Sequence, residues 1–165
     1  MRPLNDSDVS TMIPWVNDLE LTKYLTLGPP ISEEQERDWL ASVTQSETDA
    51  VFGIVVRESN IYIGNIDLHN IDRNAGTADI GIFIGAIDQQ GKGYGTEAVR
   101  LIVAYACCNL GIKNIRAVTF AQNLQSIALF EKTGFKKEGT IPRDFCKNGG
   151  WVDSIVYTCA CSEGC

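Results

Sequence analysis

The segment DQQGKGYGTEA contains residues whose types and spacing could bind an anion. Gly91, Gly93 and Gly95 alternate with Lys92 and Tyr94 directly before an apolar helical pattern. The first turn of a helix presents unpaired N–H groups and the positive end of the helix dipole, and glycines let the backbone close around a ligand. The segment therefore predicts a phosphate site, and its run of amides suits a pyrophosphate.

Two nucleotide-binding loops do not fit this segment. A dinucleotide fingerprint follows its strand directly and has an acidic residue about twenty positions later. Here the preceding strand is expected to end near Ile84, well before the first glycine, and residues 113–118 contain no Asp or Glu. A P-loop needs Ser or Thr after Gly-Lys, whereas Gly93 follows Lys92. A flexible loop without a ligand is the remaining alternative.

Sequence periodicity predicts the elements that position this loop. A short edge strand and a helix are expected first, followed by a second helix in which Ser32 and Gln35 form a capping box. The β-branched segments AVFGIVVRE, IYIGNIDLHNI and TADIGIFIG predict an antiparallel meander. A largely buried helix over residues 96–109, a strand, a helix from the cap Asn123 to Lys132 and two strands follow. This order predicts an α+β (mixed α/β) fold around one sheet.

Composition and charge limit the possible partners. The chain has 165 residues, of which 44% are hydrophobic, and no repeat or linker, so we expect residues 1–165 to form one domain. A net charge of −7 without a basic run excludes nucleic acid as a partner; it is compatible with a cationic substrate or with solubility alone. No segment approaches the ~18 apolar residues of a membrane span, and the N-terminus does not resemble a signal peptide, so we expect a cytoplasmic protein.

The six cysteines are expected to be thiols rather than a disulfide framework or a zinc site. Cys107 and Cys108 are adjacent within a helical pattern, which suits buried thiols. Three others lie near the end of the chain, but no second pair is placed to complete a set of four metal ligands. His69 has no histidine partner. We therefore predict no metal.

A resemblance to a known family adds to this interpretation. QGKGYG, residues 90–95, resembles the Gln/Arg-x-x-Gly-x-Gly/Ala loop of the GNAT N-acetyltransferases, and AQNLQSIALFEKTGFKKEG, residues 121–139, resembles the Asn-led segment of that superfamily. The branch with ribosomal-protein N-terminal and spermidine acetyltransferases is the most similar. The resemblance covers nearly the whole chain. One departure is Phe130, at a position where many relatives have tyrosine.

The resemblance implies acetyl-CoA as the acyl donor and a sheet that is mostly antiparallel but splayed between its fourth and fifth strands. Main-chain groups of Phe83 and Ile84 would bind the pantetheine arm in that gap, and Asn123, otherwise a plain N-cap, would bind it from the helix start. Lys132 would either reach the phosphates or interact only with the negative end of the helix dipole. The implied acetyl-CoA-binding residues are Ile82, Phe83, Ile84, Gln90, Gly91, Lys92, Gly93, Tyr94, Gly95, Thr96, Asn123 and Lys132.

The implied acceptor is a primary amine of a polyamine-like or antibiotic molecule, or a protein N-terminus, which attacks the thioester directly in a ternary complex. Such an amine has a pKa of about 10.4, so roughly one molecule in a thousand is neutral at pH 7. Desolvation of the amine, or a general base, must therefore generate the neutral form that attacks. The resemblance favours Asp79 as the base, whereas Asp67, Glu33 and Glu34 are alternatives or cation-binding groups.

The general acid is the least determined part of the implied chemistry. Phe130 cannot donate a proton, so Ser126 and Tyr157 are candidates, or the thiolate leaves unaided. The same departure motivates an alternative function, an acyl-CoA-binding sensor without catalysis. Substrate loops are expected at residues 25–34 and 142–150, and the family makes a homodimer an expectation.

Overall fold

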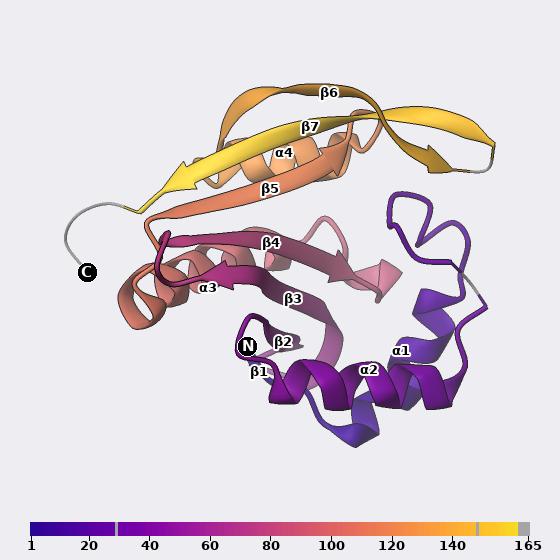
Figure 1. Ribbon diagram of the computed structural model, residues 1–165. Helices are drawn as coiled ribbons and strands as arrows, with labels where there is room; N and C mark the ends of the chain where they lie inside the picture. The colour runs from indigo at the N-terminus through magenta and orange to yellow at the C-terminus, as the bar shows by residue number, and fades with distance from the viewer. Residues whose placement is uncertain (29, 148, 162–165) are drawn as a thin grey trace.

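The computed structural model describes residues 1–28, 30–147 and 149–161. These residues form a seven-stranded sheet in the order β1-β2-β3-β4-β5-β7-β6, with helices on both faces (Figure 1). The strands are β1 (Arg2–Pro3), β2 (Ala50–Val56), β3 (Ile61–Asp72), β4 (Thr77–Ile84), β5 (Asn114–Phe120), β6 (Lys136–Lys147) and β7 (Gly150–Ala160). The helices are α1 (Val9–Val16), α2 (Glu33–Gln45), α3 (Tyr94–Leu110) and α4 (Leu124–Lys132), with 3-10 turns η1 (Asp6–Asp8) and η2 (Ile87–Gln89).

The predicted mixed α/β fold and its element order are confirmed. β2, β3 and β4 form the antiparallel meander, and the Ser32–Gln35 capping box begins α2. Gly111 ends α3 in the left-handed conformation, at φ +70. The main difference is β6, which continues through residues 142–147, where a substrate loop was expected. Pro29 and Asn148, which belong to the two expected loops, lie outside the described residues.

The sheet is open between β4 and β5, as the resemblance implied. The two strands pair in parallel only where Thr77–Asp79 meets Asn114–Arg116. Beyond Asp79 and Arg116 they diverge, and Figure 1 shows the widening gap between them. β5 instead continues its pairing with β7 along its full length. The far half of β4 therefore has a free edge that faces the gap.

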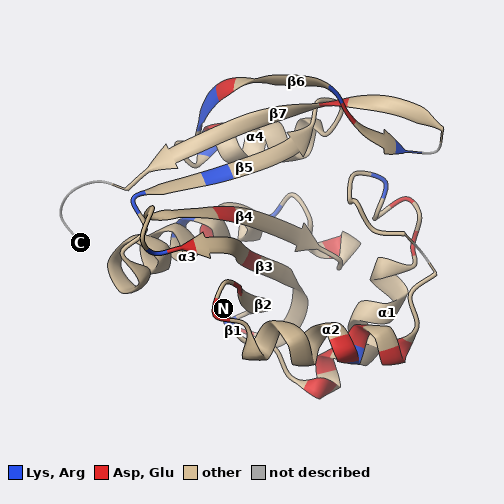
Figure 2. Cartoon of the chain, in the orientation of Figure 1, with Lys and Arg blue, Asp and Glu red and all other residues tan. Residues whose placement is uncertain are grey.

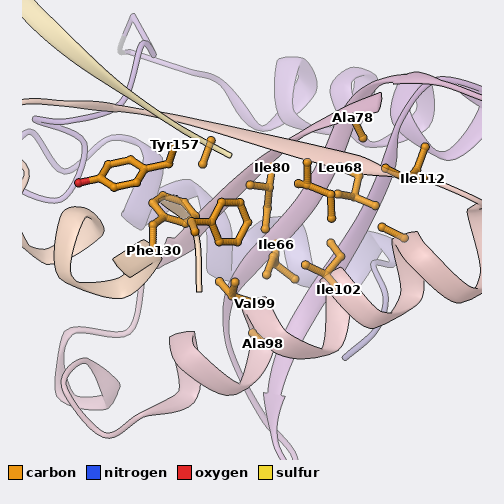
Figure 3. Packing of buried hydrophobic residues seen from close by; sticks show 14 of the residues in the cluster. Ile66, Leu68, Ala78, Ile80, Ala98, Val99, Ile102, Ile112, Phe130 and Tyr157 are labelled. Carbon is orange, nitrogen blue, oxygen red and sulfur yellow. The ribbon is translucent and has the colours of Figure 1, made fainter. Parts of the chain in front are cut away.

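The main hydrophobic core fixes α3 beneath this part of the sheet. Ile66 and Leu68 of β3 and Ile80 of β4 point to one face, where they pack with Val99 and Ile102 of α3 (Figure 3). These five side chains are at most 4% exposed. A smaller cluster packs α1 and α2 on the opposite side, around Val9, Met12 and Leu40. Because α3 is held along its length, its N-terminus is fixed at the gap.

The expectation of free thiols is wrong for Cys107 and Cys161. Cys107 in the last turns of α3 and Cys161 after β7 form a disulfide, with Cα atoms 5.7 Å apart. The two residues are 54 positions apart in sequence, so only the packing of α3 against the end of the sheet brings them together. Cys146 and Cys159 are free thiols. Cys165, part of the cluster in the sequence, lies outside the described residues.

Replacement of Cys107 by serine is expected to lower the free energy of unfolding by about 2–4 kcal/mol, because the bridge restricts the unfolded chain. Urea denaturation under oxidising conditions measures the change. Cys146→Ser is the matched control, since this thiol is exposed and unpaired, and it should stay within about 0.5 kcal/mol of wild type. In dithiothreitol the C107S and wild-type curves should coincide; a difference that persists there contradicts the prediction.

Candidate active site

The glycine loop has an open backbone at the start of α3. Gly91 and Gly93 lie at φ +73 and +92, in the left-handed region of backbone conformation that residues with a side chain rarely adopt. A β-carbon built at either position would meet no atom within 4 Å. The loop therefore uses glycine for its conformation and leaves its surface clear for a ligand.

The amides of this loop are available to an anion. The Gln90 amide donates to the Ile87 carbonyl, and the Glu97 amide donates to the Gly93 carbonyl, each at 3.1 Å. The amides of residues 91–96 lie between these two. They donate no hydrogen bond within the described part of the chain. Their unpaired N–H groups and the dipole of α3 attract the same negative charge. This is the geometry that the glycine spacing predicted.

A cavity of about 400 Å³ lies at the mouth of the gap, beside this loop. Most of the residues implied for acetyl-CoA binding line it, and so does Ser126. These are Ile82, Phe83, Ile84, Gln90, Gly91, Gly93, Gly95, Thr96, Asn123, Lys132 and Ser126. Lys92 and Tyr94 are not among its lining residues: the Lys92 ammonium donates to the Gln89 side chain at 3.2 Å, and Tyr94 packs against the core.

The register of β4 decides which main-chain groups face the gap. The Gly85 amide donates to the Ile63 carbonyl at 2.9 Å, which defines a hydrogen-bonded pair in the β3–β4 ladder. Such pairs alternate along antiparallel strands, so the main chain of Phe83 is bonded to β3. The main-chain groups of Ile82 and Ile84 point to the gap instead. Phe83 lines the cavity, but its main chain is engaged by β3, and its role in binding the pantetheine arm stays a prediction.

Gln90 links the glycine loop to this edge. Its side-chain Nε2 donates to the Ile84 carbonyl at 2.8 Å. The bond confirms that the Ile84 carbonyl points away from β3, and it occupies one of the two gap-facing carbonyls. Ile82 therefore keeps the open main-chain groups at the centre of the gap.

Asn123 and Ser126 form a reciprocal pair at the start of α4. The Asn123 Oδ1 accepts the Ser126 amide at 3.1 Å, and the Asn123 Nδ2 donates to the Ser126 Oγ at 2.9 Å. The predicted N-cap is confirmed. An amide has two N–H donors, so the second remains available to a ligand, and the Ser126 hydroxyl keeps its own proton. The cap and a ligand-binding role are compatible.

Asp79 stands where β4 and β5 part, and it does not line the cavity. Arg116 donates to its two carboxylate oxygens at 2.7 and 2.9 Å, and Asn70 donates at 2.9 Å. Burial raises the pKa of Asp79, but these hydrogen bonds outweigh burial, and the pKa lies below its ordinary value. A carboxylate held in this way is a weaker base than a free one. Its role as the general base stays a prediction.

Phe130 and Tyr157 belong to the core rather than to the cavity lining. Phe130 is 3% exposed and packs against Phe135 and Tyr157. The Tyr157 hydroxyl donates to Glu131 at 3.0 Å, and burial raises the pKa of Tyr157. Among the candidates for the general acid, only Ser126 lines the cavity. Glu33 and Glu34 are exposed in the first turn of α2 and do not line it.

Sequence reasoning missed the segment that follows α1. Leu21, Tyr24 and Leu25 line the cavity. The Lys147 ammonium donates to the carbonyl oxygens of Thr22, at 2.7 Å, and Leu25, which ties this segment to the end of β6. Burial lowers the pKa of Lys147. No local pattern marks this contact, because it joins residues more than a hundred positions apart.

Comparison with known proteins identifies the family. A family model described as "Acetyltransferase (GNAT) domain" matches residues 1–136, so the chain belongs to the GNAT acetyltransferases. "Uncharacterized N-acetyltransferase p20" of Bacillus licheniformis is 30% identical over 96% of this chain and 90% of that protein. "Probable N-acetyltransferase YjcK" of Bacillus subtilis is 39% identical over 76% of this chain and 66% of that protein.

A solved structure has a similar fold. The spermidine N-acetyltransferase of Vibrio cholerae, solved in complex with CoA and spermine, superimposes with a TM-score of 0.89 at 21% identity, over 96% of this chain and 93% of that one. The resemblance stated from the sequence is confirmed, and the protein is an N-acetyltransferase. In the described residues no group of three or more metal-binding side chains gathers, and no helix is both long and apolar enough to cross a membrane.

Proposed function

We propose that residues 1–165 form a single cytoplasmic N-acetyltransferase domain that transfers the acetyl group of acetyl-CoA to a primary amine. The acceptor is a polyamine-like or antibiotic molecule or a protein N-terminus, and it attacks directly in a ternary complex. The homodimer expected from the family belongs to the same proposal. The observation that carries it is the run of unpaired amides at residues 91–96 beside the open edge of β4.

The residues present fit acetyl-CoA. The amides of residues 91–96 suit its diphosphate, and Lys132 adds a positive charge at the cavity wall. The gap-facing main chain of Ile82 suits a pantetheine arm that lies along β4 as an added strand would. When bound, acetyl-CoA supplies an activated thioester, and the protein aligns and desolvates the reacting groups.

The acceptor side of the cavity favours a neutral amine. Leu21, Tyr24 and Leu25 present largely apolar surface there, and a poorly solvated site disfavours the charged ammonium. The Vibrio cholerae relative binds spermine in its crystal structure, which supports a polyamine as the first acceptor to test. The acidic net charge of −7 favours attraction of such a cation.

Calorimetric titration with acetyl-CoA, followed by a thiol-release assay, tests this proposal. We expect binding, and turnover with at least one amine from a panel of spermidine, spermine, N-terminal peptides and aminoglycosides. At a hundred times its Kd, CoA should stabilise the fold by about 2.7 kcal/mol. Absence of binding contradicts the proposal. Binding without turnover on the whole panel favours the acyl-CoA sensor.

A further inference from the structure

Two polar side chains of β3 lie on the sheet face opposite α3. Asp67 and His69 alternate along the strand with Ile66 and Leu68, which point into the core. The register pairs Asp67 with Gly81 and His69 with Asp79, so all four residues share this face. Figure 2 shows the acidic positions of β3 and β4 near the basic position of β5.

Gly81 lets the Asp67 carboxylate reach across β4. A β-carbon at Gly81 would lie 2.6 Å from Asp67 Oδ1 and 3.0 Å from Oδ2, so the carboxylate occupies the space that a side chain would fill. Gly81 directly precedes Ile82, whose main chain faces the gap. The last residue of β4 that pairs with β5 is Asp79. The Asp67 carboxylate therefore extends over β4 at Gly81, where β4 is no longer paired with β5.

The two carboxylate oxygens of Asp67 have different environments. Oδ2 lies 2.7 Å from His69 Nδ1, within hydrogen-bond distance. Oδ1 has no hydrogen-bond donor among the residues that the structure describes. The Asp67 side chain is 29% exposed, so its carboxylate is partly accessible to a ligand and to water, although neither Asp67 nor His69 lines the cavity. Asp79, by contrast, has both oxygens engaged by Arg116.

We infer that Asp67 receives the ammonium group of the acceptor at Oδ1 and takes one proton from it, while His69 positions the carboxylate through Oδ2. The inference rests on the proposed function and deepens it. The N–H bond of the ammonium breaks and an O–H bond forms at Oδ1, which leaves the amine lone pair for attack. The proton then passes to water, because Asp67 is partly exposed. His69 is a positioning residue in this step.

The protonation state of His69 controls the charge of the pair. The hydrogen bond to Asp67 raises the pKa of His69, burial opposes it, and the carboxylates of Asp67, Asp79 and Asp49 raise it further. Arg116 is the cation on the same face, held by Asp79. Protonated His69 neutralises Asp67, so the acceptor is bound better as pH rises through the raised pKa of His69.

Steady-state kinetics with spermine or the best amine of the panel test the inference. Asp67→Asn should lower kcat/KM for the amine by about a hundredfold, the lower end of the usual range for a lost general base, with the Kd for acetyl-CoA unchanged. His69→Gln keeps an N–H donor but cannot titrate, so the part of the pH profile that reflects His69 should flatten. Glu58→Gln, in the exposed turn before β3, should match wild type.

A measurement that needs no turnover separates this inference from the proposed function. His69 is the only histidine of the chain, so its imidazole resonance is identified without mutagenesis. Spermine at Oδ1 should lower the pKa of His69 in wild type and leave it unchanged in D67N. If the pKa of His69 in the wild-type protein does not change when spermine is added, the inference is overturned, even if acetyl-CoA binds. It is also overturned by a D67N variant that keeps its kcat/KM within about threefold of wild type while Asp79→Asn loses it.

Discussion

Replacement of Gly93 by alanine is expected to raise the KM for acetyl-CoA at least tenfold. Gly93 lies at φ +92, so a β-carbon strains the backbone of the loop whose amides are unpaired. A hydrogen bond to a charged group contributes about 1.5–3 kcal/mol, and loss of about 1.4 kcal/mol is already a tenfold change in affinity. Calorimetric titration with CoA measures the loss directly.

Gly111→Ala controls for backbone strain. Gly111 lies at φ +70 at the other end of the same helix, and a β-carbon there would also meet nothing within 4 Å. Both variants should therefore lose about 1 kcal/mol or more of stability through strain. Only G93A should lose affinity for CoA. If the two variants bind CoA equally well, the loop amides are not the diphosphate site.

Replacement of Gly64 by alanine is expected to cost about 3 kcal/mol of stability, the upper end of the range for overpacking. A β-carbon at Gly64 would overlap the Phe83 carbonyl oxygen and lie 2.8 Å from the Ile84 Cα, and both are backbone atoms that no rotamer change can move. β4 must therefore shift away from β3. Because that segment is the free edge of the gap, activity should fall together with the melting temperature.

Gly139→Ala is the matched control for Gly64→Ala. Gly139 also lies in a strand, β6, and a β-carbon there would meet no atom within 4 Å. Thermal denaturation should place this variant close to wild type. A G64A protein as stable as G139A would show that β4 is not packed against β3 at this distance.

Local sequence chemistry was sufficient to predict the cofactor-side elements. The glycine spacing before an apolar helix and the cap at Asn123 depend on residues a few positions apart, and both predictions are confirmed as structure. The order of strands followed from β-branched alternation in the same way. These features need no knowledge of tertiary contacts.

The acceptor side could not be predicted in this way, because it depends on register and long-range packing. Asp79 was favoured from its place in the resemblance, but its engagement by Arg116 appears only when β4 pairs with β5. The reach of Asp67 depends on which β4 residue lies opposite it. The disulfide at Cys107 likewise requires two distant segments to meet.

Amide resonances of isotope-labelled protein during titration with CoA test the central claim most directly. The largest shifts are predicted at residues 91–96 and at Ile82. Pantetheine lacks the diphosphate, so it should shift the amide resonance of Ile82 but leave the resonances of residues 91–96 unchanged. If CoA binds while residues 91–96 keep their resonances, or if pantetheine shifts them equally, the diphosphate is held elsewhere and the account of this site is contradicted.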